Sequence, residues 1–164
     1  MRPSLVARIA PCLAALACAP ASTPSAGRSG GDANAGIDSL NARLVQAYRR
    51  EDPQAYAALW TDSATFEWPA FTTVRGPSGM ADMARGNWKG LSDMDLRLVV
   101  ASRRLASGHA TEWGAFEQSY RDSSGARQTE YGRYVTYLVR GGDGAWRMDR
   151  FFGFSDSTRA AATR

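Results

Sequence analysis

The fold is decided by residues 109–140, which read HATEWGAFEQSYRDSSGARQTEYGRYVTYLVR. Two runs rich in aromatic and β-branched residues, 109–120 and 128–140, are separated by Asp122-Ser123-Ser124-Gly125. Such runs favour strands, and Asp, Ser and Gly between them favour a tight turn. Similar runs precede and follow this stretch, each set off by a Gly-containing turn, so we expect four consecutive antiparallel strands. The predicted strands cover residues 95–105, 109–120, 128–140 and 145–154.

The residues before this sheet have the pattern of helices. Apolar residues recur at helical spacing from Ile37 to Tyr48. Asp52-Pro53 provides a cap followed by proline at the first helical position, and Gly76-Pro77-Ser78 opens a third helix. A short strand is expected at residues 64–68, between the second and third helices. Helices followed by an antiparallel meander predict an α+β domain, with a curved sheet closing over the helices.

Three motifs follow one another along this domain. They are residues 59–66 (LWTDSATF), Arg75-Gly76-Pro77, and Gly132-Arg133-Tyr134 leading to residues 144–148 (GAWRM). In this order they resemble the nuclear transport factor 2-like superfamily, which includes ketosteroid isomerase and the SnoaL-like polyketide cyclases. The resemblance spans residues 37–156. It implies a cone-shaped fold, with three N-terminal helices on a curved antiparallel sheet, whose open end forms an apolar cavity used for catalysis, binding or association.

The resemblance to ketosteroid isomerase also implies where a catalytic base and two oxyanion donors would lie. The base corresponds to Trp68, in the run Glu67-Trp68-Pro69, and an indole cannot take up a proton from a substrate. The oxyanion tyrosine corresponds to Leu44, and the oxyanion aspartate corresponds to Tyr134. Two roles for Tyr134 stay open: it donates a hydrogen bond to a developing oxyanion, or its ring is packed in the sheet.

The sequence does not decide which face of residues 109–120 points inward, because both alternating sets mix apolar and polar residues. If Glu112 points inward, its carboxylate in an apolar pocket would serve as a general acid or base. If Trp113 points inward, the cavity wall is aromatic. The candidate catalytic residues are therefore Glu112 and Tyr134.

Arg150 is predicted on the apolar face of the last strand, because alternation places it with Met148 and Phe152. At that position it binds an anionic group of a ligand, pairs with an acid such as Glu112, Glu117 or Glu130, or extends to the surface. The tryptophans are either core side chains or pocket residues. The candidate pocket residues are Tyr48, Trp60, Trp68, Trp88, Trp113 and Arg150.

The first eighteen residues have the pattern of a bacterial signal peptide. Two arginines precede the apolar residues 9–17, and Ala14-Ala15-Leu16-Ala17-Cys18 resembles a lipobox, which implies lipidation of Cys18. The alternative is cleavage after Ala19-Pro20-Ala21, which would release a soluble protein. We expect an exported protein, held at the cell envelope by a lipid anchor or free in the periplasm.

Disordered segments are expected on both sides of the domain. Residues 19–36 consist mostly of Ala, Pro, Ser, Thr and Gly, a composition that buries too little apolar surface to offset the entropy of ordering. The predicted layout is a signal peptide at 1–18, a linker at 19–36, a domain at 37–156 and a disordered tail at 157–164.

The composition argues against several classes of site. Cys12 and Cys18 both precede the domain, and His109, the one histidine of the chain, lies at a predicted turn. We therefore expect no metal site and no cofactor. The 20 basic residues are spread along the chain and the formal net charge is only +4, so we expect no nucleic acid partner.

Two functions remain after these exclusions. The first is the binding of a small hydrophobic molecule in a cone-shaped pocket, with the isomerase, cyclase or dehydratase type of activity that the resemblance implies. The second is a non-catalytic association module of the cell envelope, which forms a homodimer through the outer face of the sheet.

Overall fold

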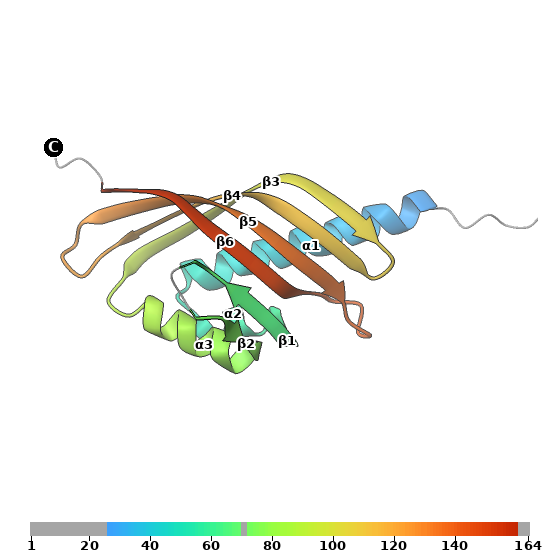
Figure 1. Cartoon of the computed structure of the whole chain (residues 1–164), viewed down its shortest axis with the longest axis horizontal. Coiled ribbons are helices and arrows are strands. Elements are labelled where there is room, and N and C mark those ends of the chain that lie inside the picture. Colours follow the sequence, from blue (N-terminus) through green and yellow to red (C-terminus); the bar gives the residue numbers. More distant parts are fainter. Residues whose placement is uncertain (1–25, 70–71, 161–164) are drawn as a thin grey trace, which may run out of the picture.

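The computed structural model describes residues 26–69 and 72–160 and has the predicted α+β architecture. A six-stranded sheet packs against three helices (Figure 1). The helices are α1 (Ala26–Arg49), α2 (Pro53–Ala57) and α3 (Gly76–Asn87). The strands are β1 (Trp60–Glu67), β2 (Val74–Arg75), β3 (Ser92–Ala106), β4 (His109–Arg121), β5 (Arg127–Arg140) and β6 (Trp146–Ala160).

The four long strands form the antiparallel meander that the sequence predicts. The strand order is β2-β1-β6-β5-β4-β3, and each neighbouring pair from β3 to β6 is antiparallel. Strand β1 pairs in parallel with β6, which joins the segment before α3 to the last strand. In Figure 1 the long strands twist together across α1, while α2, α3 and the two short strands lie next to one another. The helices therefore cover one face of the long strands.

Helix α1 supplies the main apolar layer under the sheet. Ile37 and Leu40 are fully buried, and Leu44 and Tyr48 follow at the same helical spacing, which places all four on one face. The short helix α2 then begins at Asp52, whose carboxylate accepts the backbone N–H groups of Gln54 and Ala55 at 3.0 and 2.9 Å. Strand β1 begins three residues after the end of α2.

The structure differs from the prediction at the start of the domain. Helix α1 begins at Ala26 and not at Ile37, so residues 26–36 of the predicted linker are helical. A count of apolar side chains does not reveal that small residues let the helix backbone approach the sheet closely. A Cβ atom on Gly36 would lie 2.6 Å from Cδ1 of Trp146, so the small residues allow the helix to continue against the sheet.

The end of the domain also extends further than predicted. Strand β6 runs to Ala160 and pairs with β5 along its length, so residues 157–160 of the predicted tail belong to the sheet. The predicted signal peptide, Cys18, and the first part of the predicted linker lie outside the described residues. Within the described residues, none of the helices combines the length and the apolar character needed to cross a membrane.

Candidate ligand-binding site

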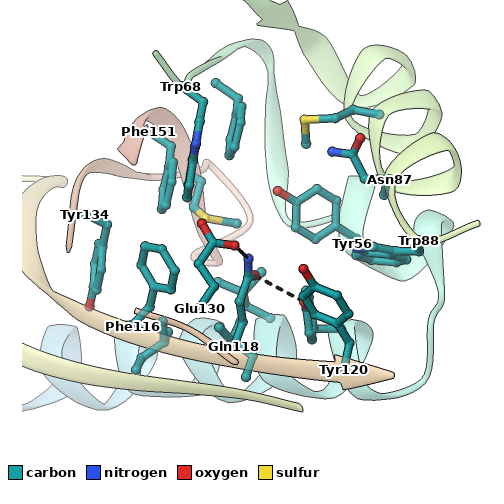
Figure 2. A pocket seen from close by; sticks show the side chains of 18 of the residues that line it. Tyr56, Trp68, Asn87, Trp88, Phe116, Gln118, Tyr120, Glu130, Tyr134 and Phe151 are labelled. Atoms are coloured by element: carbon teal, nitrogen blue, oxygen red, sulfur yellow. Dashed lines mark hydrogen bonds between the residues drawn. The ribbon is translucent and has the colours of Figure 1, made fainter. Parts of the chain in front are cut away.

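A cavity of about 340 Å³ lies between the sheet and the helices. This volume is at the small end of the range of small-molecule pockets, roughly 300–1,000 Å³. Its lining side chains come from all three helices and from β1, β3, β4, β5 and β6 (Figure 2), and most of them are aromatic or aliphatic. The polar lining residues are Tyr48, Tyr56, Asn87, Gln118, Tyr120, Glu130 and Tyr134.

One wall of the cavity, the aromatic wall, is a stack of nearly parallel rings. They are Trp68, Phe66, Phe151 and Tyr134 in that order, with centroid separations of 5.8, 5.2 and 6.0 Å and interplanar angles of 8°, 2° and 4°. Gly153 makes room for the stack, because a Cβ atom there would lie 2.1 Å from Cζ3 of Trp68. Such a wall suits a planar apolar ligand.

Another part of the lining carries a chain of hydrogen bonds from α1 across the sheet, the polar chain (Figure 2). Tyr48 Oη donates to Oε1 of Gln118 at 3.1 Å, and Nε2 of Gln118 donates to Oε2 of Glu130. Ser155 Oγ donates to the other oxygen of Glu130. The antiparallel register places Gln118 of β4 directly opposite Glu130 of β5. Glu130 thus accepts a hydrogen bond at each oxygen and keeps lone pairs for a ligand.

Glu130 differs from the other lining residues in its charge. It is the one acidic side chain on the wall among the described residues, and no described Arg or Lys forms an ion pair with it. The carboxylate is therefore not neutralised by the protein and can accept a proton or a hydrogen bond from a bound molecule.

Burial keeps the cavity tyrosines protonated. Loss of hydration raises the pKa of Tyr48, Tyr56 and Tyr134 well above the ordinary value for tyrosine, and the charge of Glu112 raises that of Tyr134 further. Tyr48 and Tyr134 donate to neighbouring side chains, but the hydroxyl of Tyr56 has no hydrogen-bond partner among the described residues. Each hydroxyl remains a donor at neutral pH.

Glu112 lies in a closed cluster beside the cavity and not on its wall. Its side chain is 0% exposed, pairs with Arg103 at 2.5 Å, and accepts hydrogen bonds from Nδ2 of Asn41 and Oη of Tyr134, both at 2.9 Å. Arg103 also pairs with Asp38 of α1 at 2.7 Å. We call these five residues the Glu112 cluster. The inward face of β4 is thus the one that carries Glu112, but the structure places this residue in a buried ion pair and away from the reach of a ligand.

Tyr134 connects the Glu112 cluster to the aromatic wall. Its ring lines the cavity and stacks on Phe151, while its hydroxyl proton is used in the hydrogen bond to Glu112. The packed-ring alternative therefore describes Tyr134, and its hydroxyl is not free to donate to an oxyanion. Of the predicted pocket residues, Tyr48, Trp60, Trp68 and Trp88 line the cavity.

Arg150 was predicted on the inner face and lies on the outer face. The register of β6 against β5 shifts between Met148 and Arg150, which marks a bulge at Asp149. Asp149 accepts a hydrogen bond from Thr61 Oγ1 at 2.7 Å, which fixes the bulge. The extra residue reverses the alternation, so Phe151 lines the cavity and the Arg150 side chain is 47% exposed.

Trp113 also lies outside the cavity, because it alternates with the inward Glu112 along β4. Its ring instead packs under the Arg104 guanidinium, 5.6 Å from the ring centroid. His109 is exposed and stacks on Tyr137. Among the described residues there is no group of three or more His, Cys, Asp and Glu side chains that could hold a metal ion.

The residues of the site that were not predicted as functional include Gln118, Glu130 and Tyr56. Glu130 was considered only as a partner for Arg150. Gln118 shares the inner face of β4 with Glu112, and Glu130 shares that of β5 with Tyr134. Once the inward face of one residue is known, the period of two places the others. The alternation was visible in the sequence, but the sequence did not show which residue of each strand points inward.

Solved structures share this fold at low sequence identity. A ketosteroid isomerase-like protein from Erwinia carotovora atroseptica is 19% identical, with a TM-score of 0.64 over 75% of this chain and 95% of that one. A hexachlorocyclohexane dehydrochlorinase from Novosphingobium barchaimii is 16% identical, with a TM-score of 0.71 over 84% of this chain and 95% of that one. At these identities the likeness concerns the fold alone.

Comparison at the level of sequence gives the family. No curated protein matches the chain. The family model of the SnoaL-like domain matches residues 32–151, which include most of α1, the strands β1 to β5 and the first part of β6. Together with the helix order, the sheet order and the cavity, this match confirms the predicted resemblance: the chain belongs to the SnoaL-like domain family, within the nuclear transport factor 2-like superfamily.

Proposed function

We propose that this chain binds a small, mostly apolar molecule in the cavity and removes a proton from it with Glu130, in an isomerase, cyclase or dehydratase type of reaction. The observation that carries the proposal is one carboxylate without an ion-pair partner on a mostly aromatic and aliphatic lining, within the part of the chain that the structure describes. An apolar site with few polar groups suits such a ligand. A positioned carboxylate is a common proton acceptor.

The surroundings of Glu130 support this role. Gln118 and Ser155 hold its two oxygens in place, and neither supplies a positive charge that would compete for the carboxylate. The aromatic wall and Glu130 belong to the same cavity, so a planar ligand against the rings comes within reach of the carboxylate. The names of the two structural relatives are compatible with this chemistry, because elimination of hydrogen chloride by a dehydrochlorinase also requires removal of a proton from carbon.

The test follows proton removal directly. The bicyclic ketone 2-tetralone is incubated with the protein in D₂O, and exchange at its α-carbon is followed by NMR. Glu130 takes the proton from the C–H bond, the electron pair moves into the carbonyl as an enolate, and carbon regains a deuteron from the exchanged carboxyl. We expect Glu130→Gln to slow this exchange by roughly 10²-fold or more, as removal of a general base does.

The matched control is Glu117→Gln. Glu117 lies between the cavity residues Phe116 and Gln118 on β4 and therefore points to the opposite face of the sheet. The Glu117→Gln variant should catalyse hydrogen exchange of 2-tetralone at the wild-type rate. Equal rates for wild type and Glu130→Gln would contradict the role of Glu130.

Association through the outer face is a second function, and a specific surface favours it. Trp113, Val135 and Phe152 lie directly opposite one another across β4, β5 and β6, and Phe154 follows on β6; we call these four the outer patch. Val135, Phe152 and Phe154 are 40%, 42% and 44% exposed. Adjacent exposed apolar side chains of this kind are typical of protein interfaces.

A second copy of the chain is the partner proposed for the outer patch. Light scattering after size exclusion should give the mass of a dimer for wild type and of a monomer for Phe152→Asp. Gln46→Asp, at an exposed position of α1, should leave the mass unchanged. A monomeric wild type at micromolar concentration would exclude this function.

Export to the cell envelope remains part of the proposal. It rests on the basic and apolar start of the sequence and on the lipobox-like residues that end in Cys18. Labelling of cells with a palmitate analogue should mark the wild-type chain and not Cys18→Ser. An unlabelled wild-type chain in the periplasmic fraction would instead support ordinary cleavage, and a cytoplasmic chain would contradict export.

A further inference from the structure

We propose that the cavity selects a ligand with a positively charged nitrogen, which the Glu130 carboxylate and the surrounding aromatic rings bind together. This inference rests on the proposed function, because it names the ligand class of the same cavity. It concerns the charge that the ligand carries, whereas the proposed function concerns the proton that Glu130 removes.

The first observation is the sign of the charge on the cavity lining. Within residues 26–69 and 72–160, the lining contains one acidic side chain, Glu130, and no arginine, lysine or histidine. Gln118 and Ser155 donate hydrogen bonds to the two carboxylate oxygens, and both donors are neutral. A carboxylate that is partly removed from water is stabilised by a nearby positive charge. The described lining supplies none, and a cationic ligand does.

The charge of Glu130 also acts on two hydroxyl groups of the lining. Tyr48 and Tyr120 both border the cavity. Burial raises the pKa of each tyrosine, and the negative charge of Glu130 raises both pKa values further. The electrostatic potential in this part of the cavity is therefore negative, which attracts a cation and disfavours an anion.

The second observation is the number of aromatic rings around this charge. Half of the residues that line the cavity are Phe, Tyr or Trp. In the view of Figure 2 the Glu130 carboxylate lies among these rings, with Phe151 on one side and Tyr56 on the other. The face of an aromatic ring attracts a cation that lies within about 6 Å of its centre. A cation beside Glu130 is therefore stabilised by the rings as well as by the carboxylate.

The composition of the lining also indicates which kind of cation fits. A primary ammonium has three N–H donors that need acceptors, and Glu130, Gln118 and Asn87 are the only carboxylate or amide side chains on the described part of the lining. A quaternary ammonium has no N–H donor, and its methyl groups pack against ring faces. It also leaves lone pairs of Glu130 free, so binding of the cation and removal of a C–H proton are compatible at one carboxylate. The ligand class is thus an aromatic molecule with an alkylated ammonium group.

The experiment uses two probes of the same shape, trimethylphenylammonium and tert-butylbenzene, which differ in one atom, a charged nitrogen in place of a carbon. Their dissociation constants are measured by calorimetry for the full chain as wild type, Glu130→Gln and Glu117→Gln. The ratio of the two constants is compared between variants, because the different hydration of the probes then cancels. We expect Glu130→Gln to reduce the preference for the ammonium by roughly tenfold, the effect of losing a nearby opposite charge. Binding of tert-butylbenzene should not change.

Glu117→Gln is the matched control, because it removes the same charge from the opposite face of β4. Its preference for the ammonium should equal that of wild type. A second measurement needs no variant and does not depend on affinity. The N-methyl proton resonances of trimethylphenylammonium should move upfield when it binds to the wild-type chain, because the methyl groups lie over ring faces.

The outcomes separate this inference from the proposed function. If the probes bind but Glu130→Gln leaves the ratio unchanged, or the N-methyl resonances do not move upfield, selection of a cation is overturned and the cavity remains a binding site. If Glu130→Gln loses the preference for the ammonium but still exchanges 2-tetralone at the wild-type rate, the cation site stands and proton removal by Glu130 fails. If neither probe binds to wild type, ligand binding in the cavity and selection of a cation are both overturned.

Discussion

Glu112 and Glu130 are the same residue type on the same inner face of the sheet, yet their surroundings give them different roles. Glu112 is 0% exposed and is held by Arg103, Asn41 and Tyr134. Glu130 receives two hydrogen bonds from neutral donors and borders the cavity. The sequence does not distinguish the two, because each lies in a β-rich run with aromatic neighbours.

The difference is made by the partner that the fold brings to each carboxylate. Arg103 reaches Glu112 because β3 pairs with β4 in a register that places the two residues opposite each other. A buried charge needs such a partner, and the pair then contributes to the structure while it becomes unavailable to a ligand. At Glu130 the opposing residue is Gln118, which orients the carboxylate without neutralising it.

The largest effect should come from breaking the ion pair of the Glu112 cluster. Arg103→Leu leaves Glu112 buried without a cation, and such changes cost about 3–5 kcal/mol of stability. Glu130→Gln should change the free energy of unfolding by no more than about 1 kcal/mol, because neutral hydrogen bonds are retained. Urea unfolding followed by circular dichroism measures both.

The control for this prediction is Arg104→Leu. Arg104 is the next residue of β3, is exposed, and lies over Trp113 on the outer face. Its loss should cost within about 0.5 kcal/mol, as is usual for surface positions. If Glu130→Gln destabilised the protein as much as Arg103→Leu, the distinction between a structural and a functional carboxylate would fail.

An intermediate effect is expected where the aromatic wall touches the sheet. Gly153→Ala would place a Cβ atom 2.1 Å from Cζ3 of Trp68, so the indole must move into the cavity. Overpacking of this kind costs about 1–3 kcal/mol, and ligand binding should weaken as well. Thermal unfolding and calorimetric titration with 2-acetylnaphthalene test the two effects. Gly142→Ala has nothing within 4 Å of the added Cβ and serves as the control.

A smaller effect should separate the two kinds of tyrosine. Tyr134→Phe removes a donor from the buried Glu112 and should cost roughly 1–2 kcal/mol, because an unsatisfied buried acceptor is unfavourable. Tyr56→Phe removes no hydrogen bond within the protein and should leave stability within about 0.5 kcal/mol. The comparison is made by urea unfolding without ligand. A large loss for Tyr56→Phe would indicate a structural partner for its hydroxyl.

The last prediction concerns how stability depends on tyrosine ionisation, which has no effect at neutral pH. The folded pKa values of Tyr48, Tyr56 and Tyr134 are raised above the unfolded value, so their contribution to stability is complete below about pH 10. It is lost as the pH rises above that value, because the unfolded chain releases protons first. Absorbance at 295 nm and circular dichroism should therefore show these tyrosines ionising together with unfolding. No further rise in absorbance at 295 nm when the chain unfolds above pH 10 would contradict their burial.

Much of the fold could be predicted because it follows from local patterns. The period of two after Leu91 predicts the four long strands, and the Asp52 cap and the Gly76-Pro77 pair predict the starts of α2 and α3. Trp68 and Trp88 could be expected at the cavity because a cone of this size needs large side chains to fill it. These features depend on neighbours in the sequence or on the size of the core.

The features that could not be predicted depend on contacts between distant residues. The bulge at Asp149 reverses the facing of Arg150, and no local pattern marks it. The partner of Glu112 is Arg103 from another strand, and the choice of inward face on β4 is fixed only when the sheet closes over α1. The close approach of Gly36 to Trp146 likewise exists only in the folded chain.

The most direct test of ligand binding in the cavity uses two neighbouring residues of β3 that face opposite ways. Leu98 lines the cavity, whereas Val99 is 48% exposed. Calorimetric titration with 2-acetylnaphthalene should show saturable binding at one site for wild type and for Val99→Trp, and loss of binding for Leu98→Trp, because the indole fills the space. Undiminished binding by Leu98→Trp, or no saturable binding by the wild type, would contradict a ligand site between the sheet and the helices.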